Sequence, residues 1–445
     1  MKDMTKGSPI RLILGFAIPL FFGMLFQQFY NLVDMIIVGR FLGASALAAV
    51  GATGSINFMI IGFCMGVCNG FAIPVAQKFG AKDEKQLRYY VANSVWLSII
   101  FAVVMTVTVS LLCRNILVWM DTPEDILDAS YAYIIVIFIG IPVTYLYNLL
   151  SGIMRSLGDS KSPLIFLVIS SVLNIAFDII AIAGMHLGVA GAAGASLISR
   201  MTACFILMWR LRDPKLDIRI GTTKGVNMRM VKQILHIGIP NGIENSIFQL
   251  GRVLTVSIIA MFGTTQIAAN AIANNLDSMG VLPGTAMSLA IITVIGRCVG
   301  AGDFEQAEYY AKKMMKLTYV INGICCLVVI LTMPVTLRLY GVSGETRHLG
   351  AVLALIHNGC AIFLWPAGFC LPNVMRAAND VKFPMCVSIA SMFIFRIGLS
   401  YVTGVAMGLG AIGVWIAMII DWIVRISFFV TRFFSGKWKT FYHGE

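Results

Sequence analysis

Charged residues are scarce in this sequence, and their scarcity excludes an ordinary soluble fold. Asp, Glu, Lys and Arg together make up 12% of the 445 residues, whereas 58% of the residues are hydrophobic. A soluble domain carries about 25% charged residues. The few charges mostly lie in short segments between long apolar runs. We therefore expect an integral membrane protein with no separate soluble domain.

Motifs of common catalytic and nucleotide-binding sites are missing as well. The chain has no cluster of metal ligands, no Gly-x-Ser-x-Gly nucleophile turn and no Walker phosphate loop. Its net charge of +12 is spread over loops and forms no basic patch with interleaved aromatic residues, which argues against a nucleic-acid partner. We expect neither an enzyme nor a cofactor. An intramembrane enzyme that uses buried carboxylates remains a less favoured alternative.

Long apolar stretches are what the sequence does contain. A helix needs about 20 residues to cross a hydrocarbon layer ~30 Å thick. The first stretch is too long for a secretory signal, so we expect it to be uncleaved. Twelve stretches are long enough to span: 10–38, 46–76, 89–113, 128–154, 162–183, 187–211, 230–258, 265–298, 313–338, 348–375, 385–405 and 409–433. The prediction is an all-α protein with twelve transmembrane helices.

The sequence contains one pattern twice. Five residues recur 221 positions later: Met154, Arg155, Asp159, Lys161 and Pro163 return as Met375, Arg376, Asp380, Lys382 and Pro384. Gly80, Ala81 and Asp83 return 220 positions later as Gly300, Ala301 and Asp303. A nearly constant offset indicates a duplication. Each copy contains six spans, and because this number is even, both copies enter the membrane in the same direction. They are predicted to form two pseudo-symmetric six-helix bundles related as parallel repeats.

Basic residues set the predicted orientation and the domain boundaries. With the N-terminus in the cytoplasm, 25 of the 33 Lys and Arg residues fall in cytoplasmic segments and four in outer segments. This bias predicts that both termini are cytoplasmic. The longest break between spans is polar and contains Asp213-Pro214. We predict an N-terminal lobe at 1–211, a cytoplasmic linker at 212–229 and a C-terminal lobe at 230–445.

Two acids in the first half are the leading functional candidates. An ionisable group at membrane depth is costly unless it lines a wet cavity or has a partner. Asp34 lies six residues before Arg40, about 9 Å from the outer end of its span, and Asp178 lies eight residues before His186, about 12 Å deep. The two carboxylates are therefore predicted to share one level in the outer half of the first bundle.

Polar residues accompany both acids along their helices. Tyr30 and Gln27 precede Asp34 by four and seven residues, and Asn174 precedes Asp178 by four. Such spacings place each set on one helical face. Two close carboxylates in a low-dielectric site must share a proton or hold a cation between them. The alternative is a hydrogen-bonded pair that only joins two helices.

Further polar residues lie within predicted spans, and their roles stay open. Glu244 either attracts a cationic substrate in the second lobe or pairs with an arginine of another helix. Asn270, Asn274 and Asp277 share one helical face that either lines a cavity or makes structural bonds. Asp277 occupies the position of Asn57 in the other copy.

Several motifs together resemble the multidrug and toxic compound extrusion (MATE) family, most closely its bacterial DNA-damage-inducible branch. The resemblance covers essentially the whole chain. It is carried by four segments: Tyr30-Asn31-Leu32-Val33-Asp34, Gly80-Ala81-x-Asp83, Met154-Arg155-x-x-Gly158-Asp159 and Leu173-Asn174-x-x-x-Asp178. It implies a two-lobed, twelve-helix antiporter that exports cationic or amphipathic organic compounds by alternating access in exchange for H⁺ or Na⁺.

The resemblance also assigns roles to residues. It implies a cation-coupling site at Asp34, Asn174 and Asp178, which are the possible Na⁺ ligands, with Ser196 where a Thr is common. Tyr30 and Gln27 are implied to line the same cavity. Ser151 departs from the pattern, because this branch often has an Asn there.

We expect the coupling chemistry to lie in the first lobe. The residues expected to line the substrate cavity are Gln27, Tyr30, Asn57, Ser151, Glu244, Asn270, Asn274 and Asp277. The expected location is the cell membrane, corresponding to the inner membrane of a two-membrane cell. The expected partners are small organic substrates, H⁺ or Na⁺ and the lipid bilayer, and nothing in the sequence requires an oligomer, so we expect a monomer. A lipid-linked saccharide flippase is a related alternative, but such proteins usually have more spans and a basic central cavity.

Overall fold

The apolar runs begin and end at polar residues and glycines, and these runs form long helices. The computed structural model describes residues 9–120, 122–212 and 227–442. Every regular element in these ranges is helical. Leu111 on one helix and Phe363 on another keep 79% and 72% of their surfaces exposed, as apolar side chains that face lipid do. The prediction of an all-α membrane protein is confirmed.

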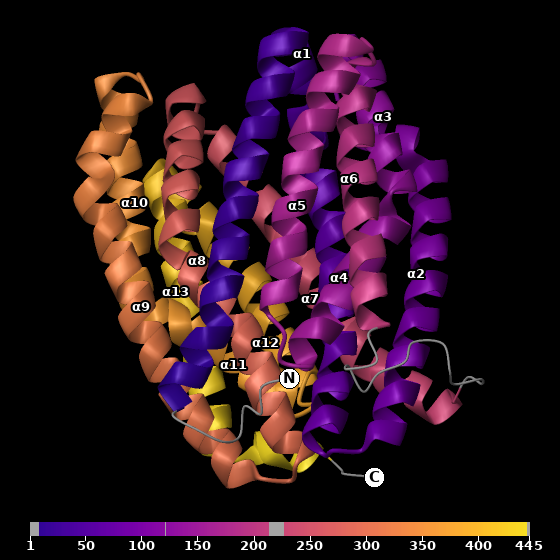
Figure 1. Ribbon diagram of the computed structural model, residues 1–445. Helices are drawn as coiled ribbons and strands as arrows, with labels where there is room; N and C mark the ends of the chain where they lie inside the picture. Colours follow the sequence, from indigo (N-terminus) through magenta and orange to yellow (C-terminus); the bar gives the residue numbers. More distant parts are fainter. Residues whose placement is uncertain (1–8, 121, 213–226, 443–445) are drawn as a thin grey trace. The chain divides into compact units, whose positions relative to one another are not determined.

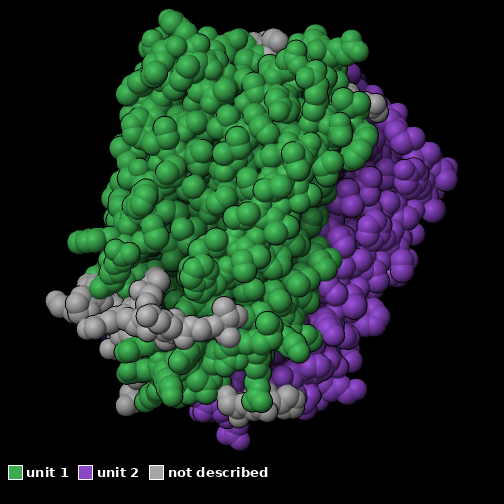
Figure 2. All heavy atoms as spheres, turned by 90° about the vertical axis from the view of Figure 1, so that its right-hand side faces the viewer, with its two compact units in different colours: residues 1–7, 14–246 green, residues 8–13, 247–445 purple. Residues whose placement is uncertain are grey.

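The helices divide into two compact units, coloured green and purple in Figure 2. Unit 1 contains residues 1–7 and 14–246, and unit 2 contains residues 8–13 and 247–445. The helices that belong to unit 1 wholly or in greater part, of which Figure 1 labels α1 to α6, are α1 (Pro9–Gly80), α2 (Glu84–Trp119), α3 (Glu124–Ile139), α4 (Ile141–Ser156), α5 (Lys161–Asp178), the π-helical η1 (Ile179–Gly184) and α6 (Gly188–Leu211).

Helix α7 (Met228–Ala260) begins in unit 1 and ends in unit 2. The remaining elements belong to unit 2: α8 (Thr264–Gly300), α9 (Phe304–Leu339), α10 (Gly344–Trp365), η2 (Pro366–Cys370), α11 (Leu371–Ala377), α12 (Lys382–Ser391), η3 (Met392–Gly398), η4 (Tyr401–Ala406), α13 (Gly410–Phe434) and the short 3₁₀ helix η5 (Lys437–Phe441). Elements η2, η3 and η4 are π-helical.

All twelve predicted spans fall on helices. Within the described ranges, ten helical segments are long and apolar enough to cross a membrane, and the pair α3 and α4, bent by 46°, makes an eleventh. The predicted span 230–258 falls on α7, which has 33 residues. Glu244 and Arg252 interrupt the apolar sequence of α7, so only the length of this helix supports it as a twelfth membrane-spanning segment.

The backbone repeats as the sequence does. Helix α1 is interrupted at Gly43 (φ 85°, ψ −178°), and the equivalent Gly263 caps α8 with nearly the same angles (φ 98°, ψ 172°). Residues with left-handed φ recur at offsets of 220 to 222 positions, in the pairs Gly43 and Gly263, Lys82 and Gly302, Gly158 and Asn379, His186 and Gly408, and Gly188 and Gly410. The π-helical segments η1 and η4 are also equivalent. The duplication therefore extends to the irregular turns.

Close packing of α7 against α1 explains why unit 1 extends to residue 246. A Cβ atom added at Gly70 would lie 2.6 Å from the Cα atom of Gly238, so the two helices touch at their backbones. The ring of Phe71 also packs directly against Gly238. The first half of α7 thus belongs to the core of unit 1. The predicted linker at 212–229 falls mostly outside the described residues, as do the start of the first predicted lobe and the end of the second.

Candidate functional site

Three helices of unit 1 bring the predicted coupling residues together. Tyr30 and Asp34 lie one turn apart on the first part of α1, and Asn174 and Asp178 lie one turn apart on α5. Ser196 comes from α6. Asn174 and Asp178 are almost completely buried, with 1% and 0% of their surfaces exposed. Asp178 is the last residue of α5 before the π-helical segment η1, a kind of helix irregularity that is frequent at functional sites.

Asn174 connects the other members of this cluster. Its side-chain amide satisfies its neighbours when Nδ2 donates to Asp178 Oδ2 at 3.0 Å and to Tyr30 Oη at 3.2 Å. In this orientation Oδ1 accepts hydrogen bonds from Ser196 Oγ at 3.0 Å and from the Ser196 backbone N–H at 2.9 Å. The Tyr30 hydroxyl also lies 3.1 Å from Ser196 Oγ. Four side chains from three helices therefore form one hydrogen-bonded network.

The carboxyl groups of Asp34 and Asp178 lie close enough to interact electrostatically. A hydrogen bond between two carboxyls requires a proton on one of them, because an ionised carboxylate only accepts. Each acid also has a buried Oδ1 atom without a hydrogen-bond partner in the described part of the chain. The pair thus offers free oxygen atoms at a place where an uncompensated negative charge is costly. A proton or a small hard cation meets that need.

A buried apolar cluster and an arginine lie in the same part of unit 1 as the carboxyl pair. Ile37, Val38, Ile182 and Ala192 form a buried apolar cluster on α1, η1 and α6, the same part of unit 1 that carries the site. Arg200 on α6 donates from Nη1 to Thr144 Oγ1 at 2.9 Å, and its charge acts on Tyr30. Low polarity strengthens any electrostatic interaction at the pair.

The remaining predicted residues of unit 1 lie elsewhere on its helices. Gln27 is exposed on α1, and Ser151 is buried on α4. Asn57 lies in the second part of α1, and its Oδ1 atom is buried without a partner among the described residues. Glu244 is half-buried on the unit 1 part of α7. Among the described residues, the hydrogen bonds of the carboxyl cluster do not involve Gln27, Ser151 or Asn57.

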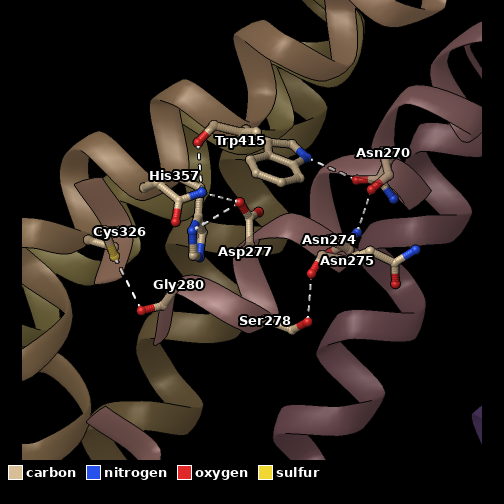
Figure 3. Close-up of polar contacts among 12 residues, drawn as sticks. Asn270, Asn274, Asn275, Asp277, Ser278, Gly280, Cys326, His357 and Trp415 are labelled. Carbon is tan, nitrogen blue, oxygen red and sulfur yellow. Dashed lines mark hydrogen bonds and ion pairs between the residues drawn. The ribbon is translucent and has the colours of Figure 1, made fainter. Parts of the chain in front are cut away.

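The predicted polar face of α8 forms a separate cluster in unit 2 (Figure 3). Asp277 Oδ1 accepts from Asn358 Nδ2 at 2.8 Å and lies 3.4 Å from His357 Nδ1. Trp415 Nε1 donates to Asn270 Oδ1 at 2.9 Å, and Asn274 Nδ2 donates to the Asn270 backbone oxygen at 2.9 Å. Asn270 and Asp277 are each 5% exposed. The face predicted from spacing therefore exists, and it contacts α10 and α13.

Three residues of the unit 2 cluster were not assigned from the sequence. Asn358 and Trp415 each supply a hydrogen bond to a predicted residue, and His357 Nδ1 lies 3.4 Å from Asp277 Oδ1. The His357 ring lies edge-on to Trp415 and Trp422, with centroids 5.9 and 5.0 Å away. His357 and Asn358 could have been identified from the sequence, because they are two adjacent polar residues in the middle of an apolar span. No spacing rule links Trp415 to α8.

Comparisons with known proteins agree with this architecture. The MatE family pattern matches residues 19–180 and again residues 240–402, one match in each sequence repeat. The probable multidrug resistance protein YoeA of Bacillus subtilis is 27% identical to the chain, over 98% of the chain and 96% of the relative. The probable multidrug resistance protein NorM of Thermotoga maritima is 24% identical, over 96% of the chain and 92% of the relative.

Solved structures give the same result. The crystal structure of MATE in the bent conformation superimposes with a TM-score of 0.87 at 25% identity and covers 97% of both chains. An outward-facing structure of a multidrug resistance MATE family transporter has the same fold, with a TM-score of 0.89 at 24% identity over 98% of both chains. Members of this family are transporters and not enzymes. On the fold, the double match and these relatives, the chain is a multi-pass membrane transporter for small organic compounds and belongs to the MatE (multidrug and toxic compound extrusion) family.

Proposed function

We propose that this transporter is a secondary active antiporter. It exports organic compounds, cationic or amphipathic, from the cytoplasm in exchange for H⁺ or Na⁺ by alternating access. It works in the cell membrane as a monomer, with both termini in the cytoplasm and without a cofactor other than the coupling ion. The observation that carries this proposal is the pair of the half-buried Asp34 and the buried Asp178, each of which has a buried Oδ1 atom without a hydrogen-bond partner among the described residues.

The pair supports coupling because it responds to charge. A proton or Na⁺ that arrives from outside neutralises the two carboxyls, and Asn174 and Ser196 are the further residues proposed to take part in cation binding. A cationic substrate is attracted by the same negative charge. Because each ligand weakens the binding of the other, the two are exchanged and do not move together. Gln27, Asn57, Ser151, Glu244, Asn270, Asn274 and Asp277 are proposed to line the substrate path.

The proposal is tested in proteoliposomes loaded with a fluorescent organic cation. A pH gradient and a Na⁺ gradient are imposed separately, and the gradient that drives dye movement identifies the coupling ion. Asp34→Asn and Asp178→Asn should each lower the driven flux to the level of empty liposomes, because neither amide can exchange a proton or carry the charge. Asp128→Asn, at a residue whose side chain is 88% exposed, is the matched control and should transport normally.

Folding of the variants is checked by size-exclusion chromatography and thermal unfolding. Wild-type flux in both Asn variants under either gradient would refute the role of the carboxyl pair. A dye that moves under neither gradient in the wild-type protein would refute antiport of such cations.

A further inference from the structure

Asp277 on α8 is a buried acid whose carboxyl group is only partly satisfied. The residue is 5% exposed, and its Oδ1 atom accepts a hydrogen bond from Asn358 Nδ2 at 2.8 Å. Its Oδ2 atom is buried and has no hydrogen-bond partner among the described residues. An ionised carboxylate in such a place is unfavourable unless a proton or a positive group compensates its charge.

His357 on α10 is the titratable residue that faces this carboxyl group. Its Nδ1 atom lies 3.4 Å from Asp277 Oδ1, as Figure 3 shows, and makes no hydrogen bond within the described ranges. The histidine is 8% exposed, so both groups are shielded from solvent. A neutral imidazole beside an ionised carboxylate leaves one buried negative charge. One added proton makes the pair neutral, whether it binds to the nitrogen or to the oxygen.

Two indole rings hold the imidazole beside the acid. The His357 ring lies edge-on to Trp422 and Trp415, with centroids 5.0 and 5.9 Å away. Trp415 is itself bound to α8, because its Nε1 atom donates to Asn270 Oδ1 at 2.9 Å. The geometry of the pair is therefore fixed by packing on α8, α10 and α13. A proton bound there changes the charge next to Trp422, which makes this indole a local optical probe.

Further ionisable groups lie on the unit 2 elements around the pair: Cys326 on α9, Asp421 and Arg425 on α13, Arg396 on η3 and Arg252 on α7. Asp421 lies 3.2 Å from Nε of both Arg425 and Arg396, so these charges largely compensate one another. The charges of Arg396 and Arg252 also act on His357. Positive charge opposes a permanent imidazolium and favours an ionised carboxylate, so a proton bound by the pair stays exchangeable.

Polar oxygen atoms continue from the pair along α8. Gly280 and Gly284 are one helical turn apart, and each leaves room for an asparagine of a neighbouring helix. A Cβ atom at Gly280 would collide with Asn358 Oδ1, and one at Gly284 would lie 3.0 Å from Asn322 Oδ1. Both oxygen atoms are buried and accept no hydrogen bond from the described part of the chain. The pair thus lies at one end of a row of free acceptors, and such acceptors suit the passage of a proton.

The pair occurs in one repeat only. At the offset of 220 Asp277 corresponds to Asn57, and at the offset of 221 His357 corresponds to Val136. Neither of these unit 1 residues exchanges a proton near neutral pH. The backbone plan that the two repeats share therefore does not depend on an acid and a histidine at these positions.

We propose that Asp277 and His357 form a proton-binding site in unit 2, which takes one proton from solution and releases it again. Its role in transport rests on the proposed antiport function, which it deepens by assigning H⁺ as an ion that unit 2 binds. The pair suits a proton better than Na⁺, because Na⁺ is a hard cation that prefers oxygen ligands and an imidazole offers nitrogen.

The test is a pH titration of tryptophan fluorescence on the full chain in nanodiscs, without dye and without a gradient. We expect a change that fits one proton with a midpoint between about pH 5 and pH 8. Trp422→Phe should remove most of its amplitude, because this indole lies beside His357. Trp209→Phe, at a unit 1 tryptophan that is 75% exposed, is the matched control and should keep the amplitude.

Variants of the pair identify the groups that titrate. Asp277→Asn should abolish the change, because a buried imidazole without its acid stays neutral. His357→Gln should move the midpoint by about one pH unit or more, because the two groups titrate as a unit. Asp277→Glu keeps the carboxyl group and should retain a titration, which separates loss of the proton site from misfolding. Asp34→Asn should titrate as the wild-type protein does.

Three results would overturn the proposal. They are a flat wild-type signal over this pH range, an unchanged titration in both Asp277→Asn and His357→Gln, and a titration that disappears in Asp34→Asn. Thermal unfolding of each variant checks that it is folded. Because neither a substrate nor a gradient is used, a failure of driven transport would leave this result standing and would refute the antiport proposal alone.

Discussion

At the scale of single residues, Asn174 organises the unit 1 site because it contacts Tyr30, Asp178 and Ser196 at once. An amide can donate to a carboxylate through nitrogen and accept from a hydroxyl through oxygen. It therefore fixes one oxygen of Asp178 and leaves the other oxygen free. This arrangement leaves the Oδ1 atoms of the two acids available to an ion.

The Tyr30 hydroxyl belongs to this network but makes no hydrogen bond to a carboxylate in the described structure. Tyr30→Phe removes its contacts with Ser196 and Asn174 but keeps the ring. One hydrogen bond is worth about 0.5–1.5 kcal/mol. We expect gradient-driven dye flux to fall by about two- to tenfold, with only a small decrease in thermal stability. The same change at the exposed Tyr401 should have no effect, and unchanged flux in Tyr30→Phe would remove this tyrosine from the site.

Some of the site residues could be predicted from the sequence and others could not. Asp34, Asp178 and Asn174 are identifiable because polar groups inside apolar spans are rare and costly. Ser196 carries no such signal, because small hydroxyl residues are common in membrane helices, and it was assigned only through family resemblance. The contacts of Asp277 with Asn358 and of Asn270 with Trp415 depend on how α8, α10 and α13 pack, which one sequence does not contain.

At the scale of helices, glycine decides how closely α1 and α7 approach within unit 1. Gly70 faces the Gly238 backbone at a distance that leaves no room for a Cβ atom. Gly70→Ala should therefore push the helices apart and cost about 1–3 kcal/mol. Thermal unfolding of the purified protein in detergent measures the effect as a lower midpoint temperature.

A matched variant separates packing from helix propensity. Gly194 on α6 has nothing within 4 Å of its added Cβ atom, so Gly194→Ala should keep or slightly raise the midpoint because alanine favours helix. Equal midpoints for the two alanine variants would contradict the close contact of α1 with α7.

Helix positions followed from the length of apolar runs, whereas their irregularities did not. The repeated aspartates at 83 and 303 are N-caps, with Oδ1 accepting from the backbone N–H of Gln86 at 2.9 Å and of Gln306 at 2.8 Å. Aspartate before a helix predicts such a cap. The π-helical segments after Asp178 and around Arg396 have no comparable sequence signal. They arise where packing and hydrogen bonding compete locally with α-helical geometry.

At the scale of the whole molecule, the duplicated sequence has produced two units with one backbone plan and different chemistry. The repeated left-handed residues and the equivalent η1 and η4 preserve the plan. The ionisable groups differ, because unit 1 holds the pair Asp34 and Asp178 and unit 2 holds Arg396 and Arg425 around Asp421. The repeat could be found from the constant offset alone. The division of α7 between the units could not, because it follows from backbone contact at Gly238.

The central claim is that cation and substrate compete for the carboxyl pair of unit 1. The most direct measurement is the dissociation constant of a fluorescent organic cation in wild-type protein and in Asp34→Asn, determined over a range of pH and of Na⁺ concentration. Lower pH or added Na⁺ should weaken dye binding in the wild-type protein, because the ion occupies the carboxyls, and this dependence should be lost in Asp34→Asn. The same pH and Na⁺ dependence in both proteins would contradict it.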